Sequence, residues 1–156
     1  MTANEIFALA NGLAAVGWVL LAIWPHRRFV TDVVAGRIVP GLFAVAYVAI
    51  VLTMFPRAEG SFSTLAGVST LFANPWLLLA GWLHYLAFDL LIGAWEARDS
   101  IGRRVPRWLL VPCLFLTFMF GPFGWLAYVA VRASRRRVDG ARPRQLEEPG
   151  ASRRIA

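Results

Sequence analysis

Four long apolar runs constrain this chain more than any other feature of its sequence. They cover residues 6–24, 38–55, 75–95 and 108–131, and a bilayer is crossed by roughly 20 apolar residues in a helix. In hydrocarbon the backbone must satisfy its own hydrogen bonds, so runs of this length predict helices. Barrel strands would carry a polar residue at every second position, and these runs do not. The sequence therefore predicts an all-α integral membrane bundle of four transmembrane helices over residues 1–133.

The composition excludes the common soluble classes. Apolar residues make up 58% of the 156 residues and charged residues only 16%, whereas a soluble domain has about a quarter charged residues. The net charge is +7, and all 16 basic residues are arginines. These arginines flank the apolar runs, as in membrane proteins, so we expect no nucleic-acid partner. The single Cys113 excludes an intrachain disulfide, and we expect no metal site.

The segments outside the apolar runs and a possible turn within the fourth run leave the topology open. Residues 56–74 predict a loop on the membrane surface or, alternatively, a short interfacial or re-entrant helix. Residues 134–156 are rich in Arg, Pro, Gly and Glu, so we expect a disordered tail.

Four crossings would leave seven arginines near the membrane on each side, which does not decide the orientation. A hairpin at Gly121-Pro122, which would make the fourth run re-entrant, is the alternative that would break this tie. The arginines expected to contact anionic lipid are Arg132, Arg135, Arg136 and Arg137.

The third apolar run contains the candidate catalytic residues. A carboxylate near the middle of the bilayer costs roughly 3 kcal/mol on insertion scales, so it usually faces the interior of a bundle. His84 lies near the centre of this run, and Asp89 follows five residues later, about 140° away around a helix. Glu96 lies seven residues after Asp89 and shares its face. We predict that this helix is central in the bundle, with polar groups on two faces.

Each candidate also has a plain structural explanation. His84 could bond a neighbouring helix, Asp89 could pair with an arginine from a loop, and Glu96 could belong to a solvated charge cluster. Aromatic side chains near them are candidates for ligand binding or for simple packing, and Asn74 is a candidate for ligand binding or for capping the third helix. The candidate binding residues are Asn74, Trp82, Tyr85, Phe88 and Trp95.

An imidazole and two carboxyls in an aromatic, dry bundle indicate acid–base chemistry. Low dielectric disfavours the charged forms, so one group can hold a proton while another accepts one. Aromatic faces stabilise a developing carbocation as they do other cations. This combination fits rearrangement of a lipid-soluble olefin or epoxide, and it also fits a proton relay or a haem held by His84. The sequence contains neither a Ser/His/Asp arrangement nor a Gly-rich phosphate loop, which argues against hydrolysis by a triad and against phosphate transfer.

Two segments of the chain resemble the abscisic-acid-deficient-four-like family of membrane proteins: GWLHYLAFDLLIGAWEARDS at 81–100 and VPCLFLTFMFGPFGWLAYVAVR at 111–132. The His-Tyr-x-x-x-Asp core and the LTF-x-x-GP-x-G block within them support the resemblance together. Plant members are associated with neoxanthin synthesis, in which an epoxide opens and a neighbouring proton is lost without net redox change. The resemblance implies a four-span protein whose ligand is a carotenoid or another apolar isoprenoid.

From these observations we expect a cofactor-independent isomerase that acts on such an isoprenoid within the bilayer. In this hypothesis His84 donates or relays a proton, and Asp89 or Glu96 is the base. The alternative is a non-catalytic membrane protein that binds a carotenoid, a lipid or, through His84, haem. A small proton-coupled transporter is a third hypothesis, and it would require a homo-oligomer. The all-arginine chain favours a bacterial member in the cytoplasmic membrane, with a substrate other than the precursor of neoxanthin.

Overall fold

The computed structural model describes residues 1–140, and all regular secondary structure within them is helical. Three helical stretches are long and apolar enough to cross a membrane: Ala3–Ile23, Phe29–Arg57 and Pro75–Gly102. The all-helical fold is thereby confirmed, with three candidate membrane-spanning helices, whereas the fourth crossing is not. The elements are α1 (Ala3–Ile23), the π-helix η1 (Phe29–Ile38), α2 (Val39–Met54), the 3-10 turn η2 (Phe55–Arg57), α3 (Leu65–Ala73), α4 (Pro75–Gly102), α5 (Arg107–Phe120) and α6 (Pro122–Gly140).

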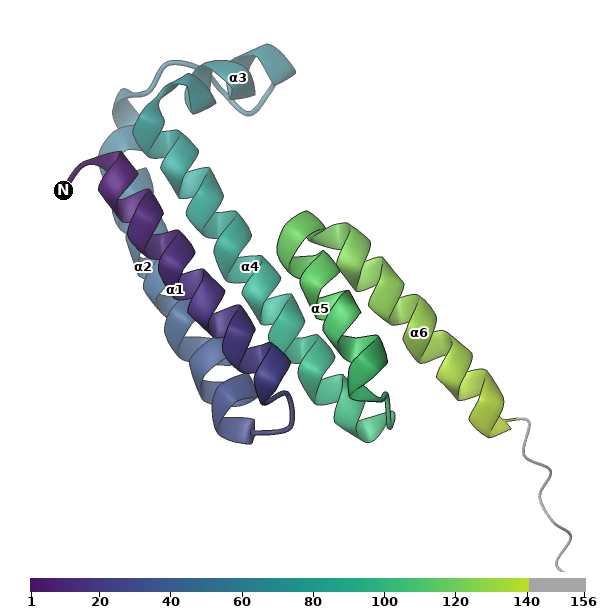
Figure 1. The fold of residues 1–156 in the computed structure, drawn as a ribbon. Helices are drawn as coiled ribbons and strands as arrows, with labels where there is room; N and C mark the ends of the chain where they lie inside the picture. The colour runs from purple at the N-terminus through teal and green to yellow at the C-terminus, as the bar shows by residue number, and fades with distance from the viewer. Residues whose placement is uncertain (141–156) are drawn as a thin grey trace, which may run out of the picture.

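The central helix is α4, with α1 and α2 on one side of it and the pair α5 and α6 on the other (Figure 1). It begins after Asn74, whose side-chain oxygen accepts the N–H of Trp76 at 2.9 Å, and Pro75 suits the first turn, where no N–H is needed. Its 28 residues span about 42 Å, more than the roughly 30 Å of hydrocarbon in a bilayer. One end of α4 therefore extends beyond the apolar layer.

The segment between the second and third apolar runs forms a short helix, α3, as the alternative interpretation proposed. Thr64 caps this helix by accepting the N–H of Gly67 at 3.0 Å. Figure 1 shows α3 lying across the end of the bundle where α2 ends and α4 begins. The rings of Phe55 and Phe62 stack at 5.6 Å between their centroids and hold the preceding loop against η2. This segment therefore covers one end of the space between α2 and α4.

The fourth apolar run forms two helices with a turn at Gly121-Pro122, as the alternative interpretation proposed, so the structure does not confirm the single crossing predicted over 108–131. Gly121 has a φ of +50°, a conformation that favours glycine, and it separates α5 from α6. A side-chain carbon on Gly124 would overlap the backbone nitrogen and the hydroxyl of Thr117, so only glycine allows the two helices to pack this closely. In Figure 1 the turn lies beside the middle of α4, and both ends of the hairpin lie at the same end of the bundle.

The hairpin changes where the chain leaves the bundle. The N-terminus and the C-terminal end of α6 lie at opposite ends of the molecule (Figure 1). The helix α6 continues to Gly140, so the part of the expected disordered tail from 134 to 140 is helical. Residues 141–156 of that tail lie outside the described residues.

A candidate ligand groove and two buried carboxyls

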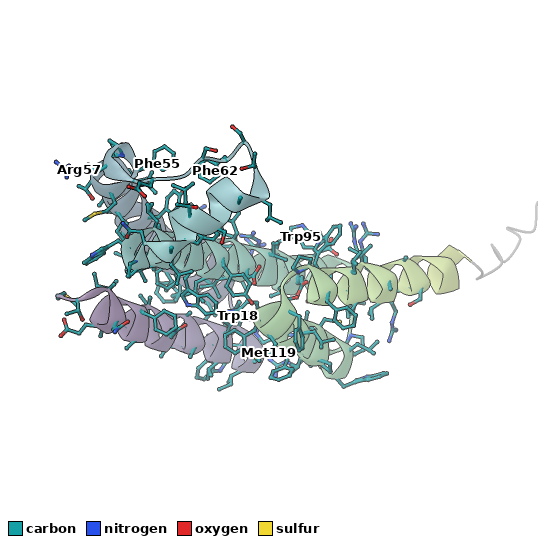
Figure 2. All side chains as sticks on the ribbon, turned by 90° about the horizontal axis from the view of Figure 1, so that it is seen from above. Trp18, Phe55, Arg57, Phe62, Trp95 and Met119 are labelled. Atoms are coloured by element: carbon teal, nitrogen blue, oxygen red, sulfur yellow. The ribbon has the colours of Figure 1, made fainter. Side chains whose placement is uncertain are left out.

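An aromatic groove lies between α2 and α4, with α3 and its preceding loop at one end. Its volume is about 380 Å³, and a second hollow of about 280 Å³ shares Tyr47 and His84 with it. We call the two together the aromatic groove. The larger hollow is lined by Tyr47, Val51, Phe55, Phe62, Leu71, Phe72, Leu77, Ala80, Gly81 and His84. In Figure 2, Phe55 and Phe62 lie close together at this end of the molecule.

His84 faces this groove from α4 and is exposed on the surface of the bundle. Its ring packs against Phe88 with centroids 4.5 Å apart and against Tyr47 at 5.8 Å. No hydrogen bond joins the imidazole to any residue between 1 and 140, unlike the other polar side chains of α4 that bond neighbouring helices. A polar group without a partner is costly in hydrocarbon. His84 is thus available to hydrogen-bond a ligand that enters from the membrane.

Small residues make room for a ligand on the α4 side of the groove. Ala80 and Gly81 occupy the turn of α4 that precedes His84. A side-chain carbon on Gly81 would lie 3.3 Å from Cζ of Phe72 on α3. A bulky residue at position 81 would therefore fill this part of the groove.

Asp89 and Glu96 lie on a different face of α4, against the α5–α6 hairpin. Asp89 is 7% exposed and Glu96 is fully buried. The hydroxyl of Thr117 donates to Oε1 of Glu96 at 3.0 Å, and the carboxyl of Asp89 lies against Gly121. Oδ2 of Asp89 and Oε2 of Glu96 find no hydrogen-bond partner among the described residues. The prediction of two polar faces is confirmed, and the structure does not bring these carboxyls together with His84.

The five predicted binding residues have separate surroundings. The indole N–H of Trp82 donates to Oδ1 of Asn11 on α1 at 2.9 Å, and the hydroxyl of Tyr85 donates to the carbonyl of Phe118 on α5 at 3.1 Å. Both residues therefore join α4 to its neighbours. Phe88 lines the smaller hollow of the groove.

The other two candidates line neither hollow of the groove. Asn74 caps the start of the helix, which is the structural explanation that the sequence allowed. Trp95 packs edge-on against Tyr128 at 5.6 Å, under the guanidinium of Arg132 at 5.8 Å. Of the five candidates, only Phe88 adjoins the aromatic groove.

A model of the ABA DEFICIENT 4-like (ABA4-like) family matches residues 5–128, which include the groove, the buried carboxyls and the hairpin turn. The chain belongs to the ABA4-like family. The resemblance seen in the sequence is thereby confirmed, and the family is linked by its name to carotenoid metabolism. No curated protein and no solved structure matches the chain.

Sequence reasoning missed the half of this ABA4-like groove that comes from α2 and α3. Tyr47, Val51 and Phe55 are spaced four residues apart, which places them on one face of α2 and of η2, which continues it. This four-residue spacing was the only sequence pattern that could have indicated the groove. In an entirely apolar run, however, the same spacing also fits a surface that packs against another helix. Phe62 and Phe72 reach the groove only because α3 lies across the bundle.

A cluster around Asp99 was also missed in part, at the opposite end of the ABA4-like bundle. Oδ2 of Asp99 accepts the hydroxyl of Tyr128 at 2.8 Å and lies 2.8 Å from Nε of Arg132, and Oδ1 lies 3.7 Å from Nε of Arg103. The cluster joins α4 to α6. On η1, Asp32 pairs with Arg98 at 3.2 Å. Across residues 1–140, no group of three or more His, Cys, Asp or Glu side chains could hold a metal ion.

Proposed function

We propose that the protein binds a carotenoid or a related apolar isoprenoid in the aromatic groove and isomerises it by acid–base chemistry at His84. One observation supports this most directly: an imidazole without a hydrogen-bond partner among residues 1–140 lies in an aromatic groove on the lipid-facing surface. Rings and aliphatic side chains suit an elongated apolar chain. A single titratable imidazole suits the one oxygen-bearing group at which the rearrangement begins.

The chemistry needs no redox cofactor when the substrate is an epoxide. The imidazolium form of His84 donates its proton to the epoxide oxygen as the carbon–oxygen bond breaks. The resulting electron deficiency spreads along the polyene and is stabilised by the faces of Tyr47 and Phe88. The neutral imidazole then removes a proton from the neighbouring carbon, whose C–H electrons form the new double bond. The product is an isomeric unsaturated alcohol, and the imidazolium is restored.

Asp89 and Glu96 retain the predicted role of base only as a second hypothesis. Neither residue lines the groove, and both lie beneath the hairpin. A ligand would reach them only after α5 and α6 had separated from α4. In the proposed mechanism their present contacts hold the hairpin, and proton transfer belongs to His84.

The first experiment uses the full chain purified from its native membrane in mild detergent. Mass spectrometry and absorption identify any bound isoprenoid, and an epoxy carotenoid supplied in vesicles tests turnover by chromatography of the products. For His84→Gln we expect roughly a 10²- to 10⁴-fold loss of turnover, the usual contribution of general acid–base catalysis. For Gly81→Leu, which fills the groove, we expect loss of both binding and turnover.

The matched control is His26→Gln, because His26 lies in the loop after α1, at the opposite end of the molecule. Unchanged turnover in His84→Gln would refute the assignment. Loss of turnover in Asp89→Asn or Glu96→Gln but not in His84→Gln would move the site to the hairpin side of α4.

Non-catalytic binding is the second candidate, because the larger hollow contains no titratable side chain besides Tyr47 and His84. A bound polyene that is never converted, in the wild type as in His84→Gln, would favour it. A Soret band that disappears in His84→Ala would instead show a haem protein.

A further inference from the structure

The arginines of the described chain gather at one end of the bundle. Of the twelve arginines among residues 1–140, ten lie in or near the loop after α1, the connection between α4 and α5, and the C-terminal part of α6, and Arg37 lies in the last turn of η1. The ion pairs Arg98–Asp32 and Arg132–Asp99 join these three regions to each other. The twelfth, Arg57, lies at the other end, where Figure 2 shows it near Phe55. The bundle is therefore strongly asymmetric in charge.

The carboxylates of this end neutralise only part of that charge. Asp32 and Asp99 pair with Arg98, Arg103 and Arg132, and Glu96 is fully buried. By contrast, Arg27, Arg28, Arg104 and Arg107 form no ion pair with any residue whose side chain the structure describes. These arginines remain available to an external anionic partner.

Large apolar side chains are exposed among these arginines. Phe29 is 67% exposed and Trp108 is 70% exposed, each directly next to an arginine in the chain. A hollow of about 320 Å³ is lined by Trp24, Arg27, Phe29 and Val30. Aromatic rings beside arginines are typical of the headgroup layer, where each ring has an apolar and a polar environment. The same surface would be poorly suited to nucleic acid, because the exposed rings would remain in water.

We propose that this arginine-rich end binds the anionic phospholipids of the leaflet on the side from which the chain is inserted, and that the N-terminus and α3 face the opposite side. Arginine-rich segments are retained on the insertion side, and each arginine near an anionic leaflet strengthens the attraction. The hairpin makes this asymmetry possible, since it returns α6 to the arginine-rich end. A fourth crossing would have divided the charge between the two sides.

Labelling of single cysteines in the full chain tests the orientation. In a Cys113→Ser background, Ser63→Cys marks the loop before α3 and Ser134→Cys marks α6. Both serines are exposed. In sealed vesicles whose outer face is the one opposite insertion, we expect a membrane-impermeant maleimide to label position 63, and position 134 only after detergent is added. The reverse pattern, or equal labelling of both positions, would overturn the inference.

Native mass spectrometry of the protein released from nanodiscs tests the lipid partner. With equal amounts of phosphatidylglycerol and phosphatidylcholine, we expect the wild type to retain phosphatidylglycerol preferentially. Arg28→Gln should weaken this preference by roughly five-fold, and the matched Arg57→Gln at the other end should leave it unchanged. Equal effects of the two variants, or displacement of the anionic lipid by a duplex oligonucleotide, would overturn the assignment.

Discussion

Replacing Gly124 with alanine tests the hairpin, which is the feature that departs most from the pattern of apolar runs. The added methyl carbon would overlap the backbone nitrogen and hydroxyl of Thr117 and the carbonyl carbon of Leu116. Two of these three atoms belong to the backbone of α5, so no change of rotamer relieves the overlap. The two helices would have to move apart at their closest approach, next to the hydroxyl that bonds Glu96.

Two other glycines supply graded controls for this change. In Gly93→Ala the new carbon would lie 2.5 Å from two ring atoms of Trp18, a side chain that is 6% exposed and can shift a little. In Gly12→Ala, on α1, the carbon meets nothing within 4 Å. Overpacking of a well-packed site costs roughly 1–3 kcal/mol. We expect about 3 kcal/mol for Gly124→Ala, about 1–2 for Gly93→Ala, and no loss or a gain of up to about 1 kcal/mol for Gly12→Ala.

Thermal unfolding of the three purified variants in the same detergent measures this order. At roughly 2–4 °C per kcal/mol for a chain of this size, Gly124→Ala should lower Tm by about 6–12 °C. Gly12→Ala should keep or raise it. If Gly124→Ala were as stable as Gly12→Ala, the close packing of α5 on α6 would be refuted, and a continuous fourth helix would again be the better description.

Two further predictions concern single hydrogen bonds and use the same unfolding assay. Trp82→Phe removes the donor to Asn11 and should cost about 0.6 kcal/mol, whereas Trp108→Phe, at a side chain that is 70% exposed, should cost nothing. Equal losses would contradict the bond between α1 and α4. Thr117→Val leaves the buried carboxyl of Glu96 without its donor and should cost about 1–3 kcal/mol, whereas Thr117→Ser keeps the hydroxyl and most of the stability. The opposite order would rule out this hydrogen bond as the contact that matters.

The crossing helices could be predicted because their signals are local. The start of α4 follows from Asn74 and Pro75, since a capping side chain followed by proline is sufficient to begin a helix. Its end could not be predicted in the same way, since the charged residues after Trp95 indicate the edge of the membrane. The helix continues there because Arg98 pairs with Asp32 on η1 and Arg103 pairs with Asp99.

The hairpin and the groove depend on contacts between segments distant in sequence. An apolar run of 24 residues does not reveal whether it turns back at Gly121; the packing of Gly124 on Thr117 decides that. Helix geometry predicted that His84 and Asp89 point in different directions. Whether each of these two side chains faces lipid or the hairpin depends on where α3 and α5 pack against α4. For this reason the sequence identified the polar residues of α4 as candidates but did not predict which of them lie together in space.

The position of the aromatic groove along α4 determines how a ligand is supplied. His84 is the tenth residue of α4, so it lies about 14 Å along the helix from the first residue, and the rest of the larger hollow lies between it and α3. The larger hollow therefore lies on the side of His84 that faces away from the arginines. A hydrophobic molecule dissolved in the adjacent monolayer reaches the groove by lateral diffusion without passing through water. Under the proposed function, a substrate made on the arginine-rich side would have to flip between monolayers before it entered the larger hollow.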